Sequence, residues 1–307
     1  MAEHLAPVLY YFGVHLLYAS AVWIAAWVLT SIPSGSATTK YWIWLASSLN
    51  FALPLGALFD ALFAPHLSFA RPLAFIGGIG LQIADNHTLA LGLGSLWLLG
   101  ASLMALRLYI RLRNERRDCY IAANREKPRF LAEGIPVTFG KSLAPIVDGI
   151  LRPRVSLPTG IDELLSEREL NAVLLHELAH AKRRDNLIRL LHEIVLCALW
   201  FHPMVWITRA RISLYRELSC DESVIQHARG RDLVSALSKL ASSERPLLLE
   251  ATASSFLSVR LARLLADQPQ RNWGLSNAVL SALFSAALTG GVLSTVAHTA
   301  CCFIHKR

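Results

Sequence analysis

Charge is scarce in this chain. Only 17% of its 307 residues are charged, whereas 54% are hydrophobic, and the mean hydropathy is +0.41. No internal repeat and no low-complexity tract interrupts this pattern. The composition therefore argues against an ordinary soluble protein and predicts a membrane protein.

Paired cysteines are also missing. The chain has five cysteines, and none of them forms a C-x-x-C pair. Paired cysteines at that spacing are typical of structural zinc sites. The sequence therefore gives no reason to expect such a site, and any metal has to be sought among histidines and carboxylates.

Several apolar stretches are long enough to cross a bilayer, which takes about 20 residues in a helix. Val8–Leu29 carries no charge, and it is too long and lacks the basic leader of a plain secretory signal, so we interpret it as a retained span. Leu187–Ile207 stays ambiguous between a core helix and a segment that enters the membrane, and His66–Ile83 favours a re-entrant or surface segment. The four predicted spans are Val8–Leu29, Tyr41–Phe63, Leu89–Leu106 and Leu275–Val296.

The basic residues indicate the orientation. Of 30 Lys and Arg residues, 26 fall between Arg107 and Arg271, and a basic cluster directly follows the third span. Under the positive-inside rule this places Arg107–Arg271 in the cytoplasm, with both termini outside. The same topology explains the isoelectric point of 9.5, so we expect the lipid bilayer as a partner and no direct contact with nucleic acid.

The most specific chemical signal is an H-E-x-x-H motif formed by His176, Glu177 and His180. Two histidines four residues apart lie on one face of a helix, where both reach one metal ion, and the adjacent glutamate serves as a general base. Ser166 and Glu169 form a capping box ahead of the motif, which predicts a helix that begins at Glu167. The motif in this setting predicts a zinc peptidase.

A catalytic zinc needs a third protein ligand. Glu217 is the best candidate, because Asp221 follows it by one helical turn and suits a carboxylate that orients a histidine ligand. Cys220 and Glu222 are expected to point away from the face of Glu217. For stabilising the oxyanion, His192, His202 and Tyr215 remain open candidates.

Short β-prone runs precede the motif helix. They are Ile135–Phe139, Pro145–Ile150 and Arg154–Leu157, separated by glycines and prolines. We expect a small sheet, whose exposed edge either pairs with an extended substrate or only covers the helices.

The chain resembles the BlaR/MecR-type membrane zinc metallopeptidases over roughly Pro128–Asp267. The likeness is carried by Gly149–Pro158, His176–Asp185, Trp200–Pro203 and Glu217–Glu222. It implies a gluzincin-like cytoplasmic domain between spans three and four, one Zn²⁺ on His176, His180 and Glu217, Glu177 as base, and a signalling role as an antirepressor that acts on a DNA-binding repressor.

One departure limits that resemblance. Sensing members carry a penicillin-binding domain after the fourth span, whereas here only His298–Arg307 follow it, with no room for an S-x-x-K motif. We therefore expect the signal to arrive through the spans, through His66–His87, or from a partner, either a separate sensor protein or a second copy in a homo-oligomer.

Together these observations predict an α+β integral membrane protein of about four transmembrane helices in the bacterial inner membrane. Residues 1–110 form a three-span region, 111–272 a cytoplasmic zinc metallopeptidase domain, and 273–307 the fourth span and a short tail. The expected function is a signal-transducing endopeptidase that acts on a cytoplasmic protein. A housekeeping membrane protease and a non-enzymatic signalling protein with a structural metal remain alternatives.

Overall fold

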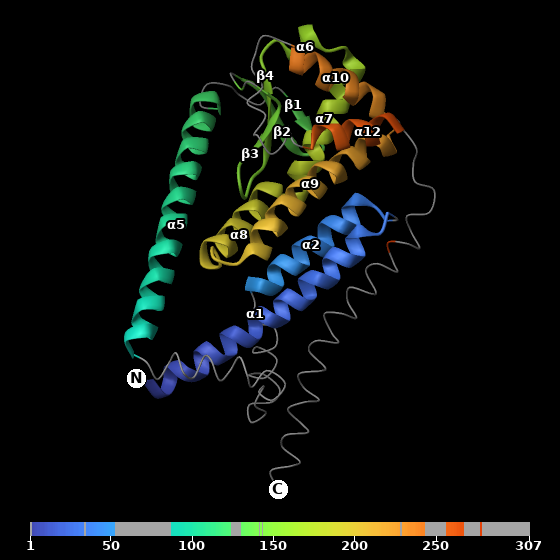
Figure 1. Ribbon diagram of the computed structural model, residues 1–307. Coiled ribbons are helices and arrows are strands. Elements are labelled where there is room, and N and C mark those ends of the chain that lie inside the picture. The colour runs from blue at the N-terminus through green and yellow to red at the C-terminus, as the bar shows by residue number, and fades with distance from the viewer. Residues whose placement is uncertain are drawn as a thin grey trace.

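The structure, a computed structural model, describes residues 2–33, 35–52, 87–123, 130–140, 142, 144–227, 229–242, 256–266 and 277. Within these ranges helices dominate and one small sheet is present, so the expected mixture of α and β structure is confirmed (Figure 1). The helices are α1 (Ala2–Ser31), α2 (Ala37–Ala52), α5 (His87–Ala123), α6 (Ile161–Leu164), α7 (Glu167–Arg183), α8 (Asp185–Ala198), α9 (Pro203–Gln226), α10 (Gly230–Ser242) and α12 (Leu257–Ala266). The strands are β1 (Phe130–Ala132), β2 (Ile135–Gly140), β3 (Ile146–Asp148) and β4 (Arg154–Pro158).

The four strands form a sheet in the order β1-β2-β4-β3. β2 and β4 pair in parallel with Val137 opposite Val155, and both outer pairs are antiparallel. Three of these strands lie where the sequence predicted them, and β1 was not predicted. Val137, Val155 and Leu157 are fully or almost fully buried in a core that also contains Ala172 of α7, so one face of the sheet packs against the motif helix.

The α9 helix belongs to two cores. Its first part packs with α1 and α2 in a cluster around Trp44, and Trp23 Nε1 donates to Thr208 Oγ1 at 2.9 Å. Its last part, through Val224, joins the core below the sheet. Because α9 touches both clusters, it connects the α1–α2 hairpin to α7.

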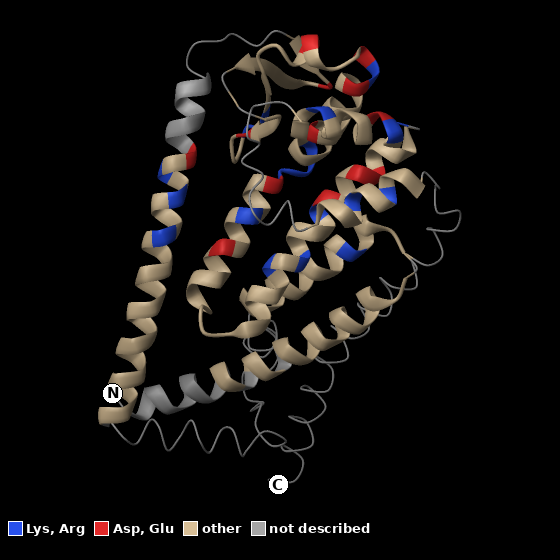
Figure 2. Ribbon diagram, turned by 45° about the horizontal axis from the view of Figure 1, so that its top comes forward, with Lys and Arg blue, Asp and Glu red and all other residues tan. Residues whose placement is uncertain are grey.

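One described helix is long and apolar enough to cross a membrane, the Thr88–Glu115 part of α5, and none of its most apolar window is buried. α1 covers the predicted first span, whereas the predicted second span is described only as far as Ala52. The predicted fourth span, apart from residue 277, and the chain after it lie outside the described residues, as does His66–Ile83. Charges gather on α7 to α12 and on one end of α5, while residues 12–31 of α1 carry none (Figure 2).

The ambiguous stretch Leu187–Ile207 is not a single helix. α8 ends at Ala198, the chain turns, and α9 begins at Pro203. Proline fits the first position of a helix, because the backbone N–H that it lacks would have no partner within the helix at that position. The stretch therefore contains the corner of a helical hairpin. It does not form one continuous membrane-spanning helix.

Candidate metal centre

The helix that carries the H-E-x-x-H motif begins where the sequence predicted. Ser166 Oγ accepts from the backbone N–H of Glu169, and Glu169 Oε2 accepts from the N–H of Ser166 at 2.8 Å, which completes the capping box. From there α7 runs without interruption to Arg183. His176 and His180 consequently lie one turn apart on the same face.

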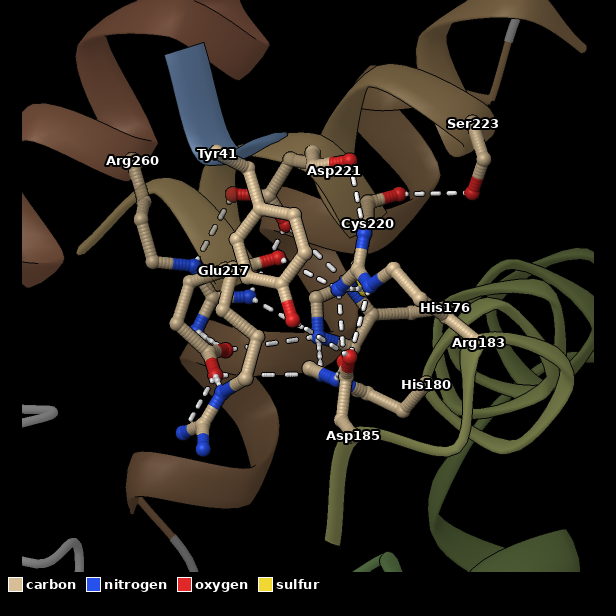
Figure 3. Close-up of polar contacts among 12 residues, drawn as sticks. Tyr41, His176, His180, Arg183, Asp185, Glu217, Cys220, Asp221, Ser223 and Arg260 are labelled. Atoms are coloured by element: carbon tan, nitrogen blue, oxygen red, sulfur yellow. Dashed lines mark hydrogen bonds and ion pairs between the residues drawn. The ribbon is translucent and has the colours of Figure 1, made fainter. Parts of the chain in front are cut away.

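The side chains of His176, His180 and Glu217 each bring a ligand atom within 4.8 Å of the other two, between α7 and α9 (Figure 3). His176 Nε2 lies 3.2 Å from His180 Nε2 and 3.5 Å from Glu217 Oε2, and His180 Nε2 lies 3.7 Å from Glu217 Oε1. Tetrahedral zinc with ligand bonds near 2.0–2.1 Å needs donors about 3.3 Å apart. The three side chains are only 8%, 13% and 13% exposed, so their spacing and their donor types fit a single zinc ion.

Each histidine has a carboxylate behind it. His176 Nδ1 lies 3.1 Å from Asp221 Oδ1, as the sequence led us to expect, and His180 Nδ1 lies 2.6 Å from Asp185 Oδ2. The contact between His180 and Asp185 depends on Arg184, which has a left-handed conformation (φ 57°) and lies between the end of α7 and the start of α8. This turn brings Asp185 back toward His180. Such carboxylates fix the ring orientation and tautomer of a metal ligand.

Arg260 of α12 adds a buried cation that the sequence did not single out. Its Nη1 lies 3.2 Å from Glu217 Oε2, and its Nη2 lies 3.4 Å from His176 Nε2. Burial opposes the charge of Arg260, but Asp221, then Glu217 and last the half-buried Glu177 raise its pKa above the usual value. The guanidinium therefore faces the ligand cluster.

The electrostatics of the cluster favour a charged Glu217. Burial alone would raise its pKa, but the charge of His180 and the hydrogen bonds from both histidines hold the pKa well below its usual range. Burial likewise opposes protonation of His176, yet Asp221 and Glu217 raise its pKa to about 9. Without a metal the three donors therefore share protons, which metal binding has to displace.

Cys220 does not point away as expected. Its sulfur joins His180 and Asp185 in a second group whose donor atoms lie within 4.8 Å of one another. Arg183, however, donates both to this sulfur at 3.2 Å and to Asp185 Oδ2 at 2.5 Å. Because a guanidinium already supplies the positive charge here, we assign the metal to the Glu217 group. The expectation for Cys220 was wrong because its position three residues after Glu217 still brings it back to the same side of the helix.

Glu222 does point away from the metal group. It accepts from the backbone N–H groups of Ala37 at 2.5 Å and Thr38 at 3.1 Å, and so it caps the first turn of α2. Its side chain is therefore committed to the α1–α2 hairpin.

The three oxyanion candidates have partners on other helices. His192 Nδ1 lies 2.6 Å from Ser48 Oγ, and Tyr215 donates to the carbonyl of Thr30 at 3.4 Å. The ring of His202 packs against that of Phe51, with 5.0 Å between the ring centroids. All these contacts lie toward α1 and α2, so none of the three is directed at the ligand cluster, whereas Arg260 is.

The family model described as BlaR1 peptidase M56 matches residues 11–233, which is most of the chain. The match extends from α1 through the sheet, α7, α8 and α9 into the start of α10.

Three curated relatives match parts of the chain. Regulatory protein BlaR1 of Bacillus licheniformis is 32% identical over 43% of this chain and 24% of its own length. The methicillin resistance mecR1 protein of Staphylococcus aureus is 27% identical over 33% of this chain and 17% of its own length. A protease HtpX homolog of Burkholderia ambifaria is 34% identical over 37% of this chain and 42% of its own length. The matched stretch thus spans less than half of each relative.

Proposed function

Since the chain belongs to the BlaR1 peptidase M56 family, and is therefore a membrane metallopeptidase, we propose that it is a zinc-dependent endopeptidase. The observation that carries the proposal is that His176, His180 and Glu217, all largely buried, bring their donor atoms close enough together for one zinc ion. Glu177 supports an active enzyme, since a purely structural metal requires ligands but has no need of an adjacent base.

The residues have separate roles in this proposal. His176, His180 and Glu217 hold one zinc ion, which when bound supplies Lewis acidity toward a peptide carbonyl and a water. Glu177 takes the proton of that water and delivers it to the leaving amine. Asp221 and Asp185 keep the two imidazoles in the orientation that presents Nε2 to the metal.

Arg260 is suited to a further role. Its guanidinium already faces Glu217 and His176, so it adds positive charge next to the place where an oxyanion develops. β3 is an edge strand of the sheet, and an extended substrate could pair with such an edge. One of its carbonyls, that of Val147, already accepts a hydrogen bond from Asn186 Nδ2 at 2.7 Å.

For the topology we propose four spans in a bacterial inner membrane. Residues 1–110 provide three of them, 111–272 form the cytoplasmic peptidase domain, and 273–307 contain the fourth. The unburied apolar window of α5, followed by the arginines that begin at Arg107, supports the third span and its orientation.

The biological role that we favour is signal transduction of the BlaR/MecR type, with a transcriptional repressor or a related cytoplasmic protein as substrate. The names "Regulatory protein BlaR1" and "Methicillin resistance mecR1 protein" among the relatives support a regulatory role. A homo-oligomer or a separate sensor protein would deliver the signal.

A housekeeping membrane protease is the second candidate. It is favoured by the 34% identity to a protease HtpX homolog, a higher identity than that to either regulatory relative. The two roles differ in their substrates: a regulator cleaves one or a few proteins, whereas a housekeeping protease cleaves many. A winged-helix repressor encoded beside this chain would favour the regulator.

The decisive experiment compares the wild type with Glu177→Gln and His176→Ala. We expect one zinc per chain by elemental analysis in the purified wild type and in Glu177→Gln, and loss of zinc in His176→Ala. In cells, proteomics of newly formed N-termini should reveal cleavage products that fall by about 10²–10⁴-fold with Glu177→Gln. His227→Gln, at an exposed histidine on the far end of α9, serves as the matched control.

Two results would contradict the proposal. If Glu177→Gln produced the same cleavage products at the wild-type rate, Glu177 would not be the base. If His176→Ala kept its zinc, the ligand assignment would be wrong.

A further inference from the structure

One tyrosine of the α1–α2 hairpin reaches the candidate metal centre. Tyr41, near the start of α2, is fully buried and lies beside the residues behind His180 (Figure 3). Its hydroxyl donates to Asp185 Oδ1 at 3.3 Å, and the other oxygen of Asp185 lies 2.6 Å from His180 Nδ1. A single carboxylate therefore stands between this hairpin and a proposed metal ligand.

Arg183 holds the same carboxylate and lies against the same tyrosine. Its Nε donates to Asp185 Oδ1 at 2.6 Å, and its Nη2 donates to Oδ2 at 2.5 Å. Its guanidinium carbon lies 4.4 Å from the centre of the Tyr41 ring, a distance at which a cation is attracted to an aromatic face. Tyr41 thus contacts both members of this ion pair, the carboxylate through its hydroxyl and the guanidinium through its ring.

A second contact from α2 ends on the same arginine. Arg183 Nη1 donates to Ser219 Oγ at 2.7 Å, and Ser219 Oγ lies 2.7 Å from Thr38 Oγ1. Thr38 in turn donates to Glu222 Oε2 at 3.1 Å, so the bonds form one chain from Arg183 to the first turn of α2. Thr38 and Tyr41 are three residues apart and lie on one face of the helix. The position of α2 therefore helps to determine where Arg183 is held.

The Tyr41 hydroxyl contributes direction more than charge. Arg183 already neutralises Asp185, whereas the hydroxyl helps to fix Oδ1 and so leaves Oδ2 directed at His180. A carboxylate in that position sets the ring orientation and the tautomer of a metal-binding histidine. A buried tyrosine with a purely structural role also needs a partner for its hydroxyl. Such a role would affect the stability of the chain but not the affinity of His180 for a metal.

We propose that Tyr41 is a positioning residue of the metal centre, which orients His180 through Asp185 and so couples the α1–α2 hairpin to the metal site. The proposal rests on the proposed function, because it requires that His180 binds zinc. Coupling between two sites is reciprocal. Zinc binding therefore strengthens the attachment of α2 to α7 and α8, and displacement of α2 weakens zinc binding.

The affinity of the purified full chain for zinc tests this coupling, measured in detergent by competition with a chromophoric chelator. Tyr41→Phe keeps the ring against Arg183 and removes only the hydroxyl. We expect it to lower zinc affinity by about three- to tenfold, less than Asp185→Asn, because Arg183 still holds the carboxylate. The visible spectrum of the Co²⁺-substituted protein should shift in the same variant, since it reports the geometry of the ligands.

Tyr215→Phe is the matched control. It also removes a buried tyrosine hydroxyl that bonds to the hairpin, in this case to the carbonyl of Thr30 at 3.4 Å, away from the ligand cluster. Thermal unfolding of the metal-free protein should show comparable losses of stability in Tyr41→Phe and Tyr215→Phe. Zinc affinity should change by less than about twofold in the control, so an equal loss of affinity in both variants would overturn the proposal.

A double-mutant cycle tests whether the effect passes through Asp185. In the Asp185→Asn background, Tyr41→Phe should cause no further loss of zinc affinity. Losses that add in full, or an unchanged affinity and Co²⁺ spectrum in Tyr41→Phe alone, would overturn the proposal. Zinc that is present in the wild type and lost in His176→Ala establishes the metal site separately, so a negative result with Tyr41 then rejects only the coupling.

Discussion

Arg260 meets Asp221 through two parallel hydrogen bonds, Nε to Oδ2 and Nη2 to Oδ1, both at 2.9 Å. Their side chains are 7% and 1% exposed, so this fork is withdrawn from water. The same Asp221 lies against His176, which means that α12 reaches a proposed metal ligand through one intermediate carboxylate. The pairing explains why a helix 84 residues beyond His176 forms part of the site.

Removal of this guanidinium should destabilise the protein strongly. In Arg260→Ala the buried Asp221 loses its counter-charge, and breaking a buried pair in this way costs about 3–5 kcal/mol. Arg260→Lys should recover only part of this stability, because a lysine ammonium cannot form two parallel hydrogen bonds with the carboxylate. Denaturant unfolding in micelles measures both, with Arg168→Ala at an exposed arginine of α7 as the control expected within about 1 kcal/mol of wild type. A similar loss in that control would show that the Asp221 contact is not the cause.

Asp185 should set the metal affinity without being a ligand. Asp185→Asn removes the carboxylate that accepts from His180, and loss of such a partner typically lowers metal affinity by about 10–100-fold. Competition with a fluorescent zinc chelator measures this change. Glu163→Gln, at an exposed carboxylate of α6, is the matched control and should bind zinc as the wild type does. An unchanged affinity in Asp185→Asn would mean that His180 is oriented by other contacts.

Ionised Glu169 should make the stability of the folded protein depend on pH in the acidic range. Bonds from Lys239, Ser235 and Ser166 lower its pKa from the usual 4.5 to about 2. Because the folded pKa is depressed, the contribution of Glu169 is fully present above pH 4.5 and disappears as the pH falls toward 2. Wild type should therefore unfold at higher temperature than Glu169→Gln at pH 6, and the gap should narrow steadily below pH 4.5. A gap that is constant with pH would assign the effect to packing alone.

Replacing Gly100 by alanine should destabilise the protein, although Gly→Ala within a helix usually stabilises it. Glycine inside a helix costs roughly 0.5–1 kcal/mol relative to alanine, so Gly→Ala usually stabilises. At Gly100, however, a Cβ would overlap with the Trp200 ring, whereas at Gly94 nothing lies within 4 Å. We expect Gly94→Ala to raise the unfolding temperature and Gly100→Ala to lower it by separating α5 from the α8–α9 corner. The same sign for both variants would rule out a tight Gly100–Trp200 contact.

The sequence predicted those parts of the site that depend on local spacing. The capping box at Ser166 gave the start of α7, and the two intervals of four residues, His176 to His180 and Glu217 to Asp221, placed four side chains on facing helices. Such patterns are fixed by helix geometry alone. They required no knowledge of how α7 and α9 pack.

What the sequence did not reveal depends on tertiary contacts. Asp185 follows His180 by five residues, a spacing that an unbroken helix would not bring together, and only the left-handed turn at Arg184 does so. Arg260 had no local signal, because its partners lie on α7 and α9. The parallel pairing of β2 with β4 likewise follows from topology and cannot be inferred from alternation within one strand.

The contacts of Glu222 with α2 and of Glu217 with the histidines limit how α9 can change in evolution. The two glutamates are five residues apart, so at about 100° per residue their side chains diverge by about 140° around the helix. One points to the ligand cluster and the other to the backbone of Ala37 and Thr38. Inserting or deleting one residue between them would rotate one carboxylate by about 100° and lose one of the two contacts. A change in length within this segment therefore breaks one of the two contacts, whichever residue is inserted or removed.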